Sequence, residues 1–249
     1  MWIIGHRGAS GLAPENTLAA FHLAADLGVH SIETDLQLSR DGRLIIFHDS
    51  TLARTTDGRG RVSGKSLDEL KRLDAGSWFR RRVPGKRAAR PFNAERIPTV
   101  EEVLVFARER NIRLYLEMKT ASGSGAEEAV VAAIRAAGAL DRCHVICFDL
   151  DVLARVRELE PAIPLGYLFS KRMRVRTAVD RAVDAGADTL LPRANRVTAK
   201  LVAEARRRDL NVVTWTVNKP KQMKKLISLG IDGIMTNYPG QLAALLRDN

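Results

Sequence analysis

Cysteine is scarce in this chain of 249 residues, which contains only Cys143 and Cys147. If both lie on one strand, their side chains point to the same face but stand too far apart for an easy disulfide. We therefore expect two small buried residues in a reducing compartment. No apolar run approaches the roughly 20 residues that a membrane helix needs. Because His6 and Arg7 interrupt the first apolar run, we also expect no signal peptide and a cytoplasmic location.

Acidic residues are the minority charge, with 29 Asp and Glu against 40 Lys and Arg and a formal net charge of +11. This balance favours anionic partners such as nucleic acid, an acidic membrane surface or phosphorylated substrates, although we attribute most of the charges to solvated helix faces. The densest basic run, Arg80–Arg90 (RRRVPGKRAAR), is the candidate for peripheral contact with an anionic membrane. It contains no aromatic residue on which bases could stack, and we expect no specific nucleic-acid partner.

A GxGxxG fingerprint is missing from the first predicted strand-to-helix turn, which disfavours a doubly wound dinucleotide-binding sheet. Instead, short β-branched apolar runs alternate with longer helical patterns along nearly the whole chain. The first run, Trp2–Gly5, precedes a helix predicted from about residue 16 to residue 27. About eight such units predict an α/β fold, a (β/α)₈ TIM barrel. We expect residues 1–249 to form a single domain of this kind.

One part of the chain departs from this alternation. The dipeptide Asp-Gly at positions 41–42 stands between two extended runs and predicts a tight hairpin turn. Counting outward from a two-residue turn places Asp35 opposite His48. The following stretch, approximately residues 50–98, has mixed character and one short helical pattern, SLDELKRL. We interpret it as a small insertion over one end of the barrel, following the hairpin after the second strand.

Chemically capable side chains follow several predicted strands. In a parallel barrel the carboxyl ends of the strands converge on one mouth, so these side chains are expected to gather there. Three of them are carboxylates, which repel one another unless a cation lies between them. Ligation by oxygen alone favours Mg²⁺, Ca²⁺ or Mn²⁺ over zinc. The candidates at the strand ends are His6, Arg7, Glu33, Asp35, Glu117, Lys119 and Trp215.

The other members of this set suit an anionic substrate. Arg7 can grip a phosphate with two hydrogen bonds, and Lys119 supplies a compact positive charge. His6 and His48 are able to transfer protons near neutral pH. A metal site, two cationic side chains that can hold a phosphate and two histidines together indicate the cleavage of a phosphodiester. We assign structural roles to the remaining histidines, which are His22, His30 and His144.

Five motifs resemble, in order, those of the glycerophosphodiester phosphodiesterase family. They are HRGASGLAPENT, IETDLQLSRDGRLIIFHDSTLARTTDGRG, IPTVEEVL, LEMK and WTVN. The resemblance covers residues 4 to about 240. It implies a TIM barrel with an insertion after His48 and Asp49, and a hydrolase that converts glycerophosphodiesters to glycerol 3-phosphate and an alcohol through a cyclic phosphate.

The resemblance also implies roles for single residues. His6 and His48 would be the acid/base pair, and Arg7 and Lys119 would bind phosphate oxygens. Trp215 would contact the substrate. One divalent cation, Mg²⁺ or Ca²⁺ with Mn²⁺ as a further candidate, would be held by the carboxylates of Glu33, Asp35 and Glu117.

Two positions depart from the family pattern. Asn237 stands where an aspartate commonly precedes the proline, and Cys147 stands where a serine is frequent. Glu15, Asn16 and Asn237 are candidates for orienting the residues of the site, and Asn16 is also a candidate N-cap of the first helix.

Two glycines in the same opening segment, Gly8 and Gly11, have a predicted conformational role. Gly8 and Gly11 would let the backbone pass close to a ligand or turn with positive φ.

Two other functions remain open at this point. A lysophospholipase D would use the same chemistry on lysolipids at a membrane surface. A non-catalytic phosphate-binding scaffold is disfavoured, because no histidine or acidic ligand of the family pattern is missing.

Overall fold

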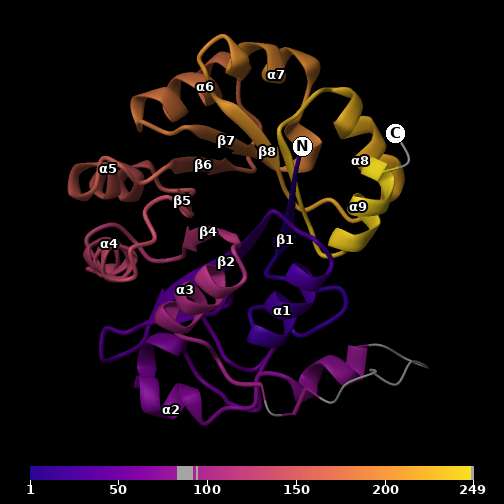
Figure 1. Ribbon diagram of the computed structural model, residues 1–249. Helices are drawn as coiled ribbons and strands as arrows, with labels where there is room; N and C mark the ends of the chain where they lie inside the picture. The colour runs from indigo at the N-terminus through magenta and orange to yellow at the C-terminus, as the bar shows by residue number, and fades with distance from the viewer. Residues whose placement is uncertain (83–91, 94, 248–249) are drawn as a thin grey trace.

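The computed structural model describes residues 1–82, 92, 93 and 95–247 (Figure 1). The basic run Arg80–Arg90 lies outside the described residues, apart from the backbone of its first three members. Within the described ranges, no helix is long and apolar enough to cross a membrane. The predicted cytoplasmic location stays a prediction.

Eight parallel strands close into a barrel, because the first strand pairs with both the second and the last. The closed ring confirms the predicted TIM barrel over the doubly wound open sheet. A short strand, β3 (Leu44–Ile46), runs antiparallel to β2 outside the ring. The barrel strands are β1 (Trp2–His6), β2 (Ser31–Leu38), β4 (Arg113–Met118), β5 (Cys143–Cys147), β6 (Leu165–Phe169), β7 (Thr189–Pro192), β8 (Asn211–Thr214) and β9 (Gly233–Thr236).

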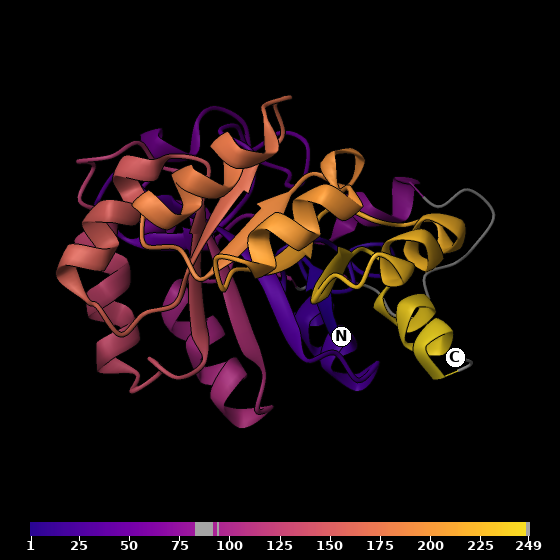
Figure 2. The same cartoon turned by 90° about the horizontal axis from the view of Figure 1, so that it is seen from above.

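Helices surround this barrel, and the last of them packs beside the first strand (Figures 1 and 2). Several begin where a side chain accepts a hydrogen bond from the first turn, as Thr99 does at α3 and Asp149 at α5. The outer helices are α1 (Leu18–Asp26), α3 (Val100–Glu109), α4 (Ala126–Ala136), α5 (Leu150–Leu159), α6 (Val175–Asp184), α7 (Ala199–Arg206), α8 (Pro220–Ser228) and α9 (Pro239–Arg247).

Apolar side chains form separate layers inside and outside the barrel. The outer layer joins the strands to the helices, and the inner one fills the barrel itself. The inner layer takes one side chain from nearly every strand: Ile4, Tyr115, Ile146, Leu168, Leu191, Val213 and Met235. The barrel is therefore a packed core, and chemistry is confined to its ends.

The segment after β3 has a small apolar core of its own. It contains α2 (Leu67–Lys71) and two 3₁₀ turns, Val62–Gly64 and Ser77–Arg82. Its buried side chains pack against Ile45 of β3. The description of residues 1–249 as one domain with an insertion near 50–98 stays a prediction.

The predicted register of the hairpin is wrong by one residue. Leu38 pairs with Leu44, and the Phe47 amide donates to the Asp35 carbonyl at 2.9 Å, so Asp35 faces Phe47 rather than His48. The loop has three residues because Gly42 adopts a left-handed φ of 73°. The Ser39 hydroxyl, which donates to Asp41 at 2.6 Å, closes this longer loop.

Both cysteines are buried and free, as expected. Burial raises the pKa of each thiol to about 12. They are consequently neutral packing residues at neutral pH.

Candidate active site

Strand pairing brings the predicted acidic residues together at the carboxyl ends of β1, β2 and β4. His6 is level with Glu33, and Asp35 is level with Glu117. Glu33 and Asp35 are two residues apart and point the same way. All three carboxylates are buried, and one oxygen from each lies within 4.8 Å of the others. We call this group the acidic triad, and the end of the barrel where it lies the mouth.

The triad fits a divalent cation. Among the described residues, Glu33 Oε1 and Asp35 Oδ1 accept no hydrogen bond although both are buried. Burial and the neighbouring carboxylates raise the pKa of Glu33 well above its ordinary value and that of Glu117 to about 7. Such repulsion and such unsatisfied oxygens are what a hard cation relieves. The triad could hold a metal ion.

Two cationic side chains lie against the triad. Lys119 Nζ donates to Glu117 Oε1 at 2.5 Å and lies 3.2 Å from Asp35 Oδ1. Arg7 Nε lies 3.2 Å from Asp35 Oδ2. Burial raises the pKa of Asp35, but the charges of Arg7 and Lys119 outweigh this effect and hold it below the ordinary value.

His6 is held with one ring nitrogen facing the site. Its Nδ1 lies 2.7 Å from Asn237 Oδ1, an oxygen that can only accept, so Nδ1 carries the hydrogen. Its Nε2 is then an acceptor, which accepts from the Thr216 hydroxyl at 3.3 Å and lies 3.9 Å from Glu33 Oε2. Burial and the charge of Arg7 lower the pKa of His6 to about 4, which keeps the ring neutral at neutral pH.

His48 lies in a different electrostatic setting. Its Nδ1 is 2.6 Å from Asp49 Oδ1, and Arg54 grips the same carboxylate from the other side. Arg54 donates to Asp49 through Nε at 2.5 Å and through Nη2 at 2.9 Å. These hydrogen bonds, with His48, lower the pKa of Asp49 to about 2. Because a carboxylate oxygen only accepts, the His48 Nδ1 carries the hydrogen, and Asp49 fixes the orientation of the ring.

Arg54 also connects His48 to the rest of the site. It donates to both oxygens of Glu15 at 2.7 Å, and Arg7 donates to Glu15 at 2.7 Å. Burial raises the pKa of Glu15, but the two arginines lower it more. An unbroken chain of ionic contacts therefore runs from Asp49 through Arg54 and Glu15 to Arg7. Sequence reasoning missed Arg54, because a single arginine in an irregular segment carries no periodic signal.

The prediction that Asn16 caps the first helix is wrong. Thr17 is the N-cap and accepts from the Ala20 amide. Asn16 instead adopts a left-handed φ of 57°, donates to Asp35 Oδ2 at 2.8 Å and accepts from Thr34 at 2.9 Å. Asn and Thr are both able to cap a helix, but the Asn16 side chain is engaged with Asp35, which leaves Thr17 as the cap. Asn16 orients a member of the acidic triad.

The two glycines of the opening segment have packing reasons. Gly8 has a φ of 81°, and a Cβ there would lie 2.7 Å from the Ala20 carbonyl oxygen. A Cβ at Gly11 would lie 2.3 Å from the Tyr238 ring. Close approach to the protein itself, rather than to a ligand, therefore accounts for both.

A cavity of about 240 Å³ opens beside His6 at the mouth. Two aromatic residues that line it, Trp78 and Phe79, belong to the insertion. They were not identified from the sequence, because that segment has no regular hydrophobic pattern. Trp215 does not line this cavity; its Nε1 donates to the Leu191 carbonyl at 2.9 Å, and its ring meets the Phe148 ring edge to face. The lining residues are His6, Arg7, Ser10, Gly11, Glu15, Trp78, Phe79, Asn237 and Tyr238.

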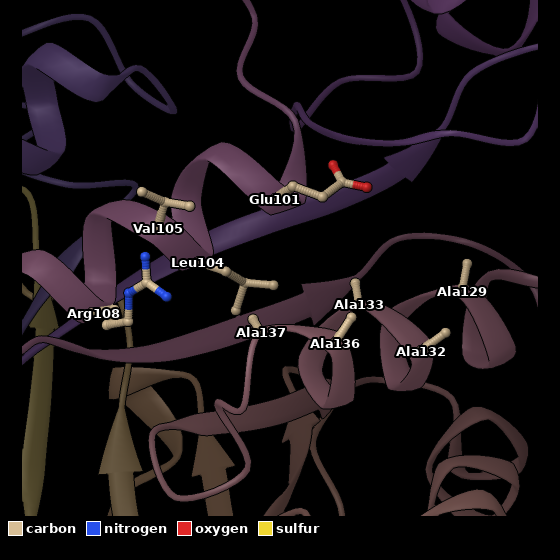
Figure 3. A pocket seen from close by; sticks show the side chains of 9 residues that line it. All are labelled: Glu101, Leu104, Val105, Arg108, Ala129, Ala132, Ala133, Ala136 and Ala137. Carbon is tan, nitrogen blue, oxygen red and sulfur yellow. The ribbon is translucent and has the colours of Figure 1, made fainter.

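The other histidines make contacts of a structural kind. His30 accepts from the Ile3 amide at 3.1 Å, His144 stacks on Tyr115, and His22 meets an aromatic ring of α3. Figure 3 shows a further groove, of about 510 Å³, on the outside of the barrel between α3 and α4. It is lined mainly by alanines and contains no cluster of catalytic groups.

Comparison with known proteins identifies the family of this chain. The family model described as the glycerophosphoryl diester phosphodiesterase family matches residues 6–241. The chain belongs to this family. A glycerophosphodiester phosphodiesterase of Caldanaerobacter subterraneus is 33% identical, covering 98% of this chain and 97% of the relative. One of Bacillus subtilis is 34% identical, covering 95% and 83%. The predicted family and enzyme class are confirmed.

The fold of this chain is also similar to that of a solved phosphodiesterase structure. An Oleispira antarctica phosphodiesterase, in complex with the product sn-glycerol-3-phosphate, is 31% identical to this chain and has a TM-score of 0.86. The similarity covers 99% of this chain and 97% of that one.

Proposed function

We propose that this chain hydrolyses glycerophosphodiesters to glycerol 3-phosphate and an alcohol by metal-dependent acid/base catalysis with His6 and His48. The observation that carries the proposal is the acidic triad, with a neutral histidine on one side and a carboxylate-paired histidine in the same ionic network. Membership of the family and the product bound to the Oleispira antarctica phosphodiesterase support the substrate class.

Charge counting supports a divalent cation at the triad. When all five carboxylates of the site are ionised, as metal ligation requires, they exceed the three permanent cations by two negative charges. Mg²⁺ or Ca²⁺, and also Mn²⁺, suits oxygen ligands and this charge. When bound, such an ion would draw negative charge from the phosphate oxygens. The carboxylates are Glu15, Glu33, Asp35, Asp49 and Glu117, and the cations are Arg7, Arg54 and Lys119.

The two histidine settings indicate different roles in the first step. His6 presents Nε2 as an acceptor, so it removes the proton from a glycerol hydroxyl of the substrate. The resulting oxygen attacks phosphorus, and the bond from phosphorus to the alcohol oxygen breaks. His48, oriented by Asp49, acts in its protonated form as the general acid and donates a proton to that departing oxygen.

The second step reverses both proton transfers. His48, now neutral, takes a proton from the water that opens the cyclic phosphate, and His6 returns its proton to the glycerol oxygen. Arg7 and Lys119 hold phosphate oxygens throughout, in place of part of their present contact with the triad. The products are glycerol 3-phosphate and the alcohol.

Activity on sn-glycero-3-phosphocholine tests the proposal. We expect His6→Ala and His48→Ala each to lower kcat by at least about a hundredfold, which is the contribution of a general acid or base. The matched control is His22→Ala, because His22 packs on α3 away from the mouth. Full activity in either of the first two variants would contradict the proton-transfer roles.

A lysophospholipase D is the second candidate. It is favoured by exposed apolar side chains beside the mouth, since Leu12 is 48% exposed and Phe148 is 41% exposed. A panel of glycerophosphodiesters and lysolipids, each assayed with Mg²⁺, Ca²⁺ and Mn²⁺, separates the two substrates and identifies the ion.

A further inference from the structure

The loops after β6, β7 and β8 carry positive charge only. Segments 170–179, 193–203 and 215–222 comprise these loops and the start of the helix that follows each. They contain nine Lys and Arg and no Asp or Glu. We call these nine residues the cationic rim: Lys171, Arg172, Arg174, Arg176, Arg193, Arg196, Lys200, Lys219 and Lys221.

Eight of these nine charges form no ion pair within the described part of the chain. Arg176 alone forms an ion pair there, 3.6 Å from Asp180, and Arg196 donates to the Ser170 carbonyl. Most of the rim is exposed. Acidic residues occupy the first turns of α3, α4 and α5, whereas the first turns of α6, α7 and α8 have none.

The rim lies at the mouth, because the carboxyl ends of parallel strands share one end of the barrel. Its three loops are joined to one another. The Arg193 amide donates to the Phe169 carbonyl at 2.9 Å, and the Ala194 amide donates to the Trp215 carbonyl at 2.8 Å. Helices α6, α7 and α8 accordingly lie next to one another in Figure 1. The acidic triad occupies the other side of the mouth, at β2 and β4.

Exposed apolar side chains share this end of the barrel. Leu12 lies in the loop after β1, and Phe148 directly follows β5. They are two of the four large hydrophobic residues that are exposed in the described ranges. Unpaired cations together with exposed apolar groups suit the surface of an anionic bilayer. A soluble polyanion would offer no apolar contact to the exposed parts of Leu12 and Phe148, so the lipid surface fits better.

We propose that the cationic rim docks the mouth of the barrel on an anionic phospholipid bilayer, with Leu12 and Phe148 at the lipid interface. Docking needs no catalysis, so it stands or fails separately from the proposed function. A vesicle-bound enzyme would meet substrates released at, or still anchored in, the membrane.

Vesicle co-sedimentation tests the proposal with the full chain. The probes are vesicles of phosphatidylcholine alone and vesicles containing about one third phosphatidylglycerol. The test variant combines Lys171→Gln, Arg172→Gln and Arg174→Gln. Each cation near an anionic surface contributes about fivefold to partitioning, so losing all three lowers binding to the anionic vesicles by about a hundredfold.

A second triple variant is the control for net charge. Arg108→Gln, Arg113→Gln and Lys225→Gln remove three exposed charges at the opposite end of the barrel. This control should bind the anionic vesicles nearly as well as the wild type, and all three proteins should hydrolyse soluble sn-glycero-3-phosphocholine at similar rates.

Three results would overturn the proposal. They are failure of the wild type to bind anionic vesicles at low salt, equal losses in both triple variants, and binding to soluble polyphosphate without binding to vesicles. An inactive wild type that still binds vesicles would refute the proposed function and leave the docking surface standing.

Discussion

Arg54 is the residue whose replacement should reveal most about how the site is held together. It makes four hydrogen bonds of 2.5–2.9 Å to two carboxylates, and its side chain is only 29% exposed. Arg54→Met keeps a flexible unbranched side chain in place of the Arg54 methylenes but removes every donor. A hydrogen bond to a charged group contributes about 1.5–3 kcal/mol, and bonds within one network are not additive. We therefore expect the free energy of unfolding to fall by about 2–4 kcal/mol.

The same substitution should lower catalysis. Asp49 loses the partner that fixes it against His48, and Glu15 loses one of the two arginines that hold it beside Arg7. We expect kcat to fall about 10- to 100-fold, with a smaller change in KM. Arg59→Met is the control, since Arg59 is exposed in the same insertion. Urea unfolding and steady-state kinetics are the two measurements. Wild-type stability and kcat in Arg54→Met would refute this account of the network.

Acid sensitivity gives an independent check on Arg54. Hydrogen bonds from Arg54 are the largest cause of the lowered pKa of Asp49, which is about 2 instead of the usual value near 4. A lowered pKa in the folded state stabilises the protein above pH 4, and this stability is lost as the pH falls toward 2. In Arg54→Met the loss of stability between pH 4 and pH 2 should be smaller. An unchanged acid titration of stability would contradict the pairing.

Three further substitutions have clear expected outcomes. Gly8→Ala should lower the free energy of unfolding by about 2–4 kcal/mol in denaturant titrations, because its Cβ would meet the Ala20 carbonyl and its φ is positive. Glu33→Gln should raise the melting temperature of the metal-free protein and abolish hydrolysis, since it relieves repulsion but removes a proposed metal ligand; a lower melting temperature would contradict this. Asn237→Ala should lower kcat about 10- to 100-fold, whereas Asn237→Asp, which still accepts from His6 Nδ1, should retain most of the activity.

The sequence predicted the barrel and most of the mouth for the same physical reason. Parallel strands of a closed barrel end at one rim, so residues at strand ends such as His6, Glu33 and Glu117 can be placed without knowing any contact. The structure brings these residues together as expected. Their roles in catalysis stay proposals.

What the sequence could not predict depends on side-chain contacts in irregular segments. The hairpin register differs by one residue because the left-handed φ of Gly42 and the hydrogen bond from Ser39 to Asp41 stabilise a three-residue loop. Thr17 rather than Asn16 is the N-cap of α1, because the side chain of Asn16 donates a hydrogen bond to Asp35. Arg54 lies in the insertion, where no hydrophobic period marks which side chains turn toward the mouth.

The most direct test of the central claim is the release of glycerol 3-phosphate from sn-glycero-3-phosphocholine by the purified chain. We predict release with Mg²⁺, Ca²⁺ or Mn²⁺, loss of release after chelation, and recovery when the ion is restored. Glu117→Gln should release no product under any of these conditions. Undiminished release in the presence of chelator, or by Glu117→Gln, would contradict the assignment of the acidic triad.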